Sequence, residues 1–290
     1  MVRPDLRAWA SPVGPVTRFA PSPTGYLHLG HVVNAVYVWG VARALGGTVQ
    51  LRIEDHDRIR CRPEYERALL DDLDWLGFVP DEGRHPLDRQ SDRSFAYEQA
   101  VQRLALSDHV YACRCSRRDI GGDRYDGRCR TRGVPMGRGT GVRVAVTAGV
   151  ERFNDLALGW MEQDPSGQAG DLLLKDRDGH WTYQLAVTVD DLHQKITLVI
   201  RGDDLLSSTG RQVRLGRMLG RLEPPRFLHH PLVIGPRGEK LSKSARDTGI
   251  RELRALGLSP AAVIGRAAAA VGLVASATDV TATEVAQLFL

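Results

Sequence analysis

The amino-acid sequence predicts a protein of the α/β class, and three segments carry that prediction. Residues 17–45 run in the order strand, Pro/Gly loop and helix. The β-prone run 196–200 is followed by a helical pattern over 207–219. Between these regions, residues 113–141 are rich in cysteine, arginine and glycine. We therefore expect a Rossmann-like parallel sheet that is interrupted by an inserted subdomain.

The first half of the sheet domain is predicted over residues 1–110. Its expected elements are a strand over 17–20, a helix over 32–45, a strand over 49–54 and helices over 64–76 and 94–110. Gly46 and Gly47 close the first helix, as glycines commonly do. The second strand delivers Glu54 at its C-terminal end, where ligands of open α/β sheets bind.

The rest of the chain divides into three parts. We predict an insertion over 111–176, the second half of the sheet domain over 177–235, and a lysine loop with a short helical C-terminal region over 236–290. Regular α/β signals resume at 181–189, followed by strands over 196–200 and 231–234 with a helix over 207–219 between them. Short helices are expected over 259–271 and 283–290.

Composition limits the function without deciding it. A formal charge of +4 and an isoelectric point near 9.0 permit contact with RNA but do not require it. No stretch approaches the roughly 18 apolar residues of a membrane span, and residues 1–15 lack the apolar region of a signal peptide. We expect a cytoplasmic protein. Four cysteines are too few for a disulfide framework.

The segment 18–31 has the composition of a phosphate-binding loop. Gly25 and Gly30 let a ligand approach the main chain closely. His28 and His31 lie at a predicted helix start, where both can donate to phosphate oxygens. Taken alone, the two histidines are better explained as solvated or core-capping residues.

A second basic loop lies far downstream. Residues 240–244 read Lys-Leu-Ser-Lys-Ser, so Lys240 and Lys243 can supply ammonium groups to the same polyphosphate. Gly235 and Gly238 lie on either side of Pro236, just before these lysines. They predict a mobile loop that closes over a nucleotide. Taken alone, this loop is a solvated turn.

Together, the two loops resemble the HIGH and KMSKS signatures of class I aminoacyl-tRNA synthetases. The sequence Arg-Phe-Ala-Pro-Ser-Pro-Thr-Gly at 18–25 looks like the glutamyl branch of that family. The resemblance implies that ATP, with Mg²⁺, is a substrate. It places His28, Gly30, His31 and Lys243 at ATP, and it assigns catalysis to His28, His31, Lys240 and Lys243.

A second set of residues lies at or near predicted strands. In glutamyl-type synthetases the matching positions contact the amino acid, so the resemblance implies a glutamate site formed by Arg18, Ser22, Glu54, Tyr183 and Arg201. A carboxylate such as Glu54 suits an α-ammonium group, and a guanidinium suits a carboxylate. Each residue alone has a simpler explanation as a strand-end charge, and Tyr183 as a core residue.

A metal site is indicated by Cys113, Cys115 and Cys129. Closely spaced thiolates in a segment with little apolar content suit one structural Zn²⁺. Three cysteines leave one ligand missing, for which His109 or water are general candidates. The order Cys-x-Cys, Tyr, Cys resembles the zinc site of certain glutamyl-synthetase-like proteins, and this resemblance implies that Tyr125 is the fourth ligand. Cys61 is expected to be an incidental thiol.

The region after the lysine loop is short for a glutamyl-tRNA synthetase. Residues 245–290 cannot supply a large helical region that reads the anticodon. The resemblance is therefore to truncated paralogues that activate glutamate without tRNA and attach it to the queuosine base of tRNA(Asp). We expect a monomer. The arginines expected to contact RNA surround the cysteines: Arg114, Arg117, Arg118, Arg124, Arg128, Arg130 and Arg132.

Three alternatives stay open at this point. The chain can be a short glutamyl-tRNA synthetase that charges a tRNA 3′ end. It can be a catalytically silent paralogue that binds glutamate or RNA, although the presence of both phosphate loops argues against silence. A generic nucleotidylyltransferase of the same fold would share the histidine pair but has no need of Arg18, Glu54 and Arg201.

Overall fold

A parallel sheet forms the centre of the molecule, as expected. The structure is a computed structural model that describes residues 4–9, 11–107, 109–233 and 249–290. Strands β1 (Val16–Phe19) and β2 (Thr48–Leu51) pair in parallel, with helix α1 (Leu29–Ala44) connecting them. Strands β8 (Leu198–Gly202) and β9 (Arg226–His230) also pair in parallel. The amide of Thr197 donates to the carbonyl of Val16 at 2.9 Å, which brings β8 beside β1.

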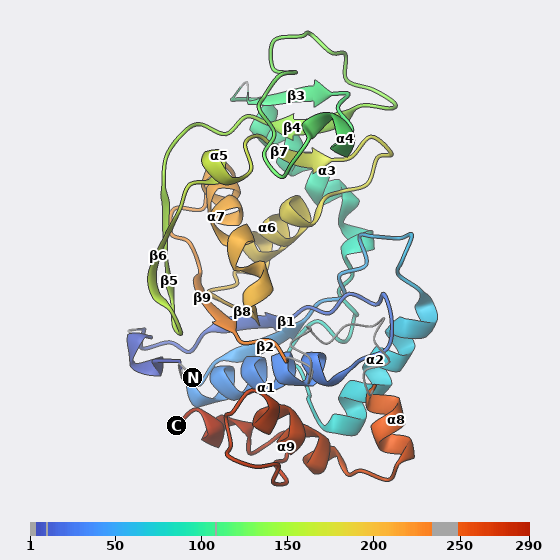
Figure 1. Ribbon diagram of the computed structural model, residues 1–290, viewed down its shortest axis with the longest axis vertical. Coiled ribbons are helices and arrows are strands. Elements are labelled where there is room, and N and C mark those ends of the chain that lie inside the picture. The colour runs from blue at the N-terminus through green and yellow to red at the C-terminus, as the bar shows by residue number, and fades with distance from the viewer. Residues whose placement is uncertain (1–3, 10, 108, 234–248) are drawn as a thin grey trace.

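Helix α1 begins three residues before the predicted start. His28 caps its N-terminus, so Leu29 is already helical. Ten residues of α1 are buried, because one face covers the sheet and another contacts the C-terminal region. Figure 1 shows this arrangement, with α1 between the central strands and the red C-terminal helices. An apolar helix with almost no polar face therefore fits a position covered on both sides.

The predicted insertion contains an antiparallel sheet of its own. This sheet has the order β3 (Val110–Cys113), β4 (Gly141–Val144) and β7 (Leu172–Lys175), with the short helix α4 (Arg117–Ile120) beside it. Helix α3 (Ser94–Ala105) leads into it, after the 3₁₀ helix η2 (Gln90–Arg93). The prediction that α3 continues to Val110 is wrong, because Val110 starts β3 and pairs with Val144.

A hairpin within residues 111–176 joins the central sheet instead. Its strands are β5 (Glu151–Asp155) and β6 (Gly159–Gln163), and Asp155 pairs with Phe227 of β9 in parallel. The resulting strand order is β6-β5-β9-β8. In Figure 1 the hairpin runs along the left side from the insertion to the central strands. The division of the chain at 110, 176 and 235 stays a prediction.

The second half differs from the sequence prediction in two places. Tyr183, expected at or near a strand, is the first residue of helix α6 (Tyr183–His193). The strand predicted over 231–234 is wrong for residues 231–233, because β9 ends at His230, and residue 234 lies outside the described residues. The remaining elements here are helix α5 (Pro165–Gln168), the 3₁₀ helix η3 (Asp203–Ser208) and helix α7 (Thr209–Met218).

The C-terminal elements α9 (Pro260–Ala270) and the 3₁₀ helix η4 (Val285–Leu288) pack against α1. Helices α2 (Pro63–Leu76) and α8 (Ile250–Ala255) contact α9, and the 3₁₀ helix η1 (Leu6–Ala8) lies at the start of the chain. Gly77 ends α2 with a φ of 82°, a left-handed conformation that favours glycine. Among the described residues, no helix has the length and apolar character to span a membrane.

Candidate active site

A cavity of about 500 Å³ opens where β1 and β8 end and α1 begins. Eight of the predicted site residues line it: Arg18, Ser22, His28, Gly30, His31, Glu54, Tyr183 and Arg201. The phosphate loop and the glutamate constellation therefore share one cavity. Lys240 and Lys243 lie outside the described residues. The structure describes the chain on either side of their loop. Val233, before the loop, lines the cavity, and Gly249, after it, forms a β-bridge with His28.

The two histidines form the cap of α1. Nδ1 of His28 accepts the Gly30 amide at 3.1 Å, and Nδ1 of His31 accepts the His28 amide at 3.1 Å. The rings lie 4.0 Å apart between centroids. Because each Nδ1 accepts a backbone N–H, a neutral ring carries its proton on Nε2. The capping role and the proposed phosphate role are therefore compatible, since capping uses one nitrogen of each ring and sets the other as a donor.

Glu54 is held from both its main chain and its side chain. Its carbonyl accepts the Ser22 hydroxyl at 2.8 Å, and its Oε1 accepts Nη2 of Arg52 at 2.9 Å. The contact between the Ser22 hydroxyl and the Glu54 carbonyl fixes these two residues relative to one another. The strand β2 ends before Glu54, at Leu51, so the carboxylate lies in the segment after the strand.

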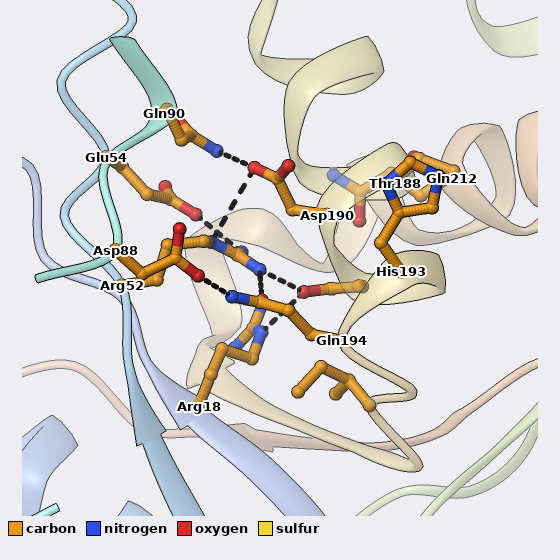
Figure 2. A network of polar contacts seen from close by, with 12 residues as sticks. Arg18, Arg52, Glu54, Asp88, Gln90, Thr188, Asp190, His193, Gln194 and Gln212 are labelled. Carbon is orange, nitrogen blue, oxygen red and sulfur yellow. Dashed lines mark hydrogen bonds and ion pairs between the residues drawn. The ribbon is translucent and has the colours of Figure 1, made fainter. Parts of the chain in front are cut away.

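Arg52 is the centre of a buried charge network that sequence reasoning missed (Figure 2). Its guanidinium is fully buried and contacts Glu54, Asp191 and the Gln194 side chain. Arg18 donates from Nε to the same Asp191 oxygen at 3.1 Å. Burial opposes a charged Arg52, but Asp191, Glu54 and Asp190 outweigh it and raise the pKa of Arg52. Two cavity residues, Arg18 and Glu54, are thus joined through Arg52 and Asp191.

Asp190 anchors the other side of this network. Its carboxylate accepts the Tyr97 hydroxyl at 2.9 Å, Nε2 of Gln90 at 2.8 Å and Nε of Arg93 at 2.5 Å. Figure 2 shows Asp190 between Gln90 and Arg52. The network therefore ties α6 to the segments that follow β2 and precede α3.

Arg201 has a different environment. It is as buried as Arg18, with 4% of its surface exposed. Its hydrogen-bond partners are His229 at 3.1 Å, Gln212 at 2.7 Å, Thr209 at 2.7 Å and the Tyr183 hydroxyl at 3.4 Å. In the described part of the chain Arg201 has no carboxylate partner, and burial lowers its pKa. A buried guanidinium with neutral partners favours an incoming anion.

Further polar residues of the cavity were not predicted. His230 accepts Nδ2 of Asn34 at 3.0 Å and lies 3.0 Å from the Pro231 carbonyl, and Asp204 lines the same wall. Burial lowers the pKa of His230 to about 4, so this ring is neutral at pH 7. The sequence signal available was the adjacent pair His229-His230 after an apolar strand, which resembles a strand-end ligand pattern.

The three cysteines of the insertion come together. Their Sγ atoms lie within 4.8 Å of one another, and Cys115 and Cys129 are 3.6 Å apart. Tetrahedral zinc with bonds of about 2.3 Å holds its sulfurs roughly 3.8 Å apart, so the spacing fits. Within the described residues this group contains no histidine, and His109 is not part of it. Cys61 lies elsewhere, 3.8 Å from the Ser22 hydroxyl oxygen.

Tyr125 completes the surroundings of the cysteines. Its hydroxyl oxygen is 3.4 Å from Sγ of Cys113 and accepts the Cys129 amide at 3.0 Å. A Cβ at Gly170 would lie 1.7 Å from the Tyr125 carbonyl oxygen, so only glycine lets this segment approach so closely. The guanidinium of Arg143 lies 3.8 Å from the centre of the Tyr125 ring. A cation on this ring lies next to the cysteine group, where it favours ionised thiols.

The fold and the site define a class of enzyme. The family described as tRNA synthetases class I (E and Q), catalytic domain, matches residues 15–278. The chain belongs to this family. A glutamate tRNA ligase from Elizabethkingia meningosepticum, solved in complex with its amino acid, has the same architecture, with a TM-score of 0.77 and 28% identity. The match covers 94% of this chain and 64% of the ligase.

Relatives within the family narrow the class. A glutamyl-Q tRNA(Asp) synthetase of Pseudomonas aeruginosa is 41% identical over 270 residues, which cover 89% of this chain and 90% of the relative. A glutamate–tRNA ligase of Nitratidesulfovibrio vulgaris is 40% identical over 261 residues, which cover 86% of this chain and 55% of the ligase. This chain thus matches nearly the full length of the first protein but little more than half of the second.

Proposed function

We propose that this protein activates glutamate with ATP and transfers it to the queuosine base of tRNA(Asp). The observation that carries the proposal is the position of Arg201, a buried guanidinium with neutral partners in the same cavity as the histidine-capped start of α1. The similarity in length and sequence to the Pseudomonas relative supports the transfer step. ATP and tRNA are cytoplasmic substrates, and all proposed glutamate contacts come from one chain, so we expect a cytoplasmic monomer.

The glutamate end of the cavity contains complementary charges. We propose that Arg201 and Tyr183 bind the side-chain carboxylate, because no carboxylate among the described residues forms an ion pair or hydrogen bond with Arg201. Glu54, fixed by Arg52, would bind the α-ammonium group, with Ser22 and Arg18 beside it. Aspartate is too short to span both groups. Glutamine lacks the charge that Arg201 requires.

The ATP end lies at the start of α1. In the activation step an oxygen of the glutamate α-carboxylate bonds to the α-phosphorus of ATP, and the bond to pyrophosphate breaks. The protein must position both substrates and stabilise the phosphate charge, which needs donors and no nucleophile. We propose His28, Gly30 and His31 at the phosphates. We propose Lys240 and Lys243 at the leaving pyrophosphate, since on one side of their loop Val233 lines the cavity and on the other Gly249 pairs with the cavity residue His28.

The insertion is the proposed RNA surface. All seven arginines predicted to contact RNA are exposed. Arg128 and Arg130 form ion pairs with Asp126 and Asp171, so they are partly neutralised. For the remaining five, no ion pair is recorded within the described residues, and they are the stronger candidates for phosphate contacts.

We propose one structural Zn²⁺ held by Cys113, Cys115, Tyr125 and Cys129. The spacing of the sulfurs and the position of the tyrosine hydroxyl support this ligand set. A closed four-ligand site supplies folding energy to the insertion and no chemistry. Elemental analysis should find about one zinc per chain. Cys129→Ser should lower that content and make the insertion sensitive to protease, while Cys61→Ser, outside the group, should change neither.

The decisive experiment combines two reactions. ATP–pyrophosphate exchange that depends on glutamate, without tRNA, is expected from a cavity complete on one chain. Labelled glutamate should then be transferred to tRNA(Asp) that carries queuosine and not to the same tRNA with guanine at that position. A tRNA(Asp) shortened at its 3′ end should still accept glutamate.

A second candidate is favoured by the glutamate–tRNA ligase relative, whose catalytic region matches at similar identity. It is a short enzyme that charges the tRNA 3′ end. In that case the 3′-shortened tRNA would be inert, and the label would appear in the 3′-terminal fragment after nuclease digestion. Exchange activity that requires tRNA would also favour this candidate over the queuosine reaction.

A further inference from the structure

Asp155, His229 and Arg201 lie in a row across three adjacent strand ends. Asp155 is the last residue of β5, and His229 in β9 is the register partner of Arg201 in β8. Oδ2 of Asp155 lies 2.6 Å from Nδ1 of His229, and Nε of Arg201 donates to Nε2 of His229 at 3.1 Å. All three side chains are buried. The sheet register therefore connects a carboxylate to the cavity guanidinium through one imidazole.

The contacts at both nitrogens fix one form of the ring. Nδ1 faces a carboxylate and must carry a proton, whereas Nε2 faces an N–H of Arg201 and must accept. Only the neutral ring with its proton on Nδ1 satisfies both. The neighbouring Thr209 hydroxyl, 3.2 Å from Nε2, can also donate to it. Burial lowers the pKa of His229, which keeps the ring neutral at pH 7 even though Asp155 acts in the opposite direction.

We propose that Asp155 and His229 are positioning residues for glutamate recognition, which hold Arg201 in the orientation that binds the substrate carboxylate. This inference rests on the glutamate site proposed above. Asp155 selects the ring form, and His229 presents an acceptor to the Nε edge of Arg201 while leaving its positive charge without a direct carboxylate neighbour. A carboxylate placed directly on Arg201 would neutralise it and compete with the substrate.

The geometry around Asp155 makes one substitution especially informative. Oδ1 of Asp155 accepts the amides of Ala157 at 2.9 Å and Leu158 at 3.0 Å. Oδ2 accepts one backbone amide, that of His229, at the longer distance of 3.2 Å. In Asp155→Asn, the two shorter contacts at Oδ1 keep the amide oxygen there, so the NH₂ group takes the Oδ2 position, gives up the contact with the His229 amide and faces Nδ1. The ring must then move its proton to Nε2, where it opposes the Nε–H of Arg201. The substitution thus inverts the ring form with little change of volume.

The test uses glutamate-dependent ATP–pyrophosphate exchange by the full chain. Asp155→Asn should raise the KM for glutamate roughly tenfold or more while the KM for ATP stays within about twofold. His229→Gln should have a smaller effect, because its side-chain carbonyl can accept from Arg201 without a ring form to select. Adding Asp155→Asn to His229→Gln should then raise the KM for glutamate little further.

A matched control comes from the other end of β5. Glu151 is also a buried carboxylate, and it forms ion pairs with Arg214 and Arg217. Glu151→Gln should leave the KM for glutamate unchanged. Equal KM changes in the Glu151 and Asp155 variants, or full additivity in the double variant, would overturn the proposal.

Two further outcomes keep the test decisive. If Asp155→Asn does not fold, His229→Leu, which offers no acceptor, should raise the KM for glutamate well above that of His229→Gln, and equal values would refute the role of His229. If the unmodified protein shows no glutamate-dependent exchange, the proposed function fails. Exchange by the unmodified protein with no KM shift in the variants overturns only the positioning role.

Discussion

Arg18 and Arg201 line the same cavity and each is 4% exposed, but only Arg18 has a carboxylate partner among the described residues. Arg18 forms an ion pair with Asp191, which Arg52 shares. Arg201 has neutral partners, and the carboxylate nearest to it in its hydrogen-bond chain, Asp155, lies behind His229. The difference teaches that burial alone does not identify a substrate-binding arginine. The informative feature is a buried charge whose compensation has been left to a ligand.

The largest effect is expected from breaking the compensated side. Asp191→Asn would leave Arg18 and Arg52 buried with one fewer charge partner, which should lower the free energy of unfolding by about 3–5 kcal/mol. Urea unfolding measures this directly. Glu162→Gln, which breaks the exposed ion pair with Arg152, should cost no more than about 1 kcal/mol. Similar losses in both variants would contradict the importance of the buried network.

The uncompensated side should respond in binding. Arg201→Met removes the guanidinium while filling most of its volume, and should raise the KM for glutamate at least about 30-fold, since losing one partner of a buried charge pair costs 2–5 kcal/mol. The same variant should lower the free energy of unfolding by less than Asp191→Asn does, because it removes hydrogen bonds to neutral partners but leaves no buried carboxylate among the described residues without its partner. A large loss of stability in Arg201→Met would show that Arg201 is compensated inside the protein.

A third buried carboxyl sharpens the comparison through pH. Asp72 in α2 is buried, its Oδ2 has no hydrogen-bond partner among the described residues, and burial raises its pKa to about 6. In the unfolded chain its pKa is near 3.9, so the folded state binds the extra proton between roughly pH 4 and 6. The ionised form therefore lowers stability above pH 6, and the effect disappears as pH falls toward 4.

Asp72→Asn should consequently increase the free energy of unfolding at pH 8 by up to about 3 kcal/mol and have little effect at pH 4. Asp191 should show the opposite sign. Although burial opposes it, Arg18 and Arg52 lower the pKa of Asp191, so its stabilisation is present above its unfolded pKa and is lost as pH falls through its folded pKa. Urea unfolding of both variants from pH 4 to 8 checks this, and parallel curves would be the contrary result.

The positions of several cavity residues could be predicted from short local sequence patterns. The loop 18–31 and the strand runs placed Arg18, Glu54 and Arg201 at strand ends, and the structure brings them into one cavity with His28 and His31. Their proposed roles stay predictions. The cysteine spacing likewise predicted a cluster, which the structure contains.

The parts that were missed depend on pairing between distant segments. Arg52 lies in an alternating strand pattern and reads as a solvent-facing residue, but α6 brings Asp190 and Asp191 over it from far along the chain. Asp155 reads as part of an insertion, and only its pairing with β9 brings it to His229. The last strand was placed too late, over 231–234, because the polar residues His229 and His230 did not look like part of a buried strand. Both are buried in β9, where Asp155 and Asn34, distant in the sequence, are their hydrogen-bond partners.

The β5–β6 hairpin also limits how this enzyme can be rebuilt. A protein engineer who exchanged residues 111–176 for the corresponding region of a relative would treat them as a detachable module. The exchange would carry Asp155 away with the module, and with it the carboxylate that orients His229. Chimeras that keep residues 151–163 from the parent chain preserve this connection. To exchange RNA-binding surfaces, the chain should therefore be joined just before residue 151 and just after residue 163, and not at residues 111 and 176.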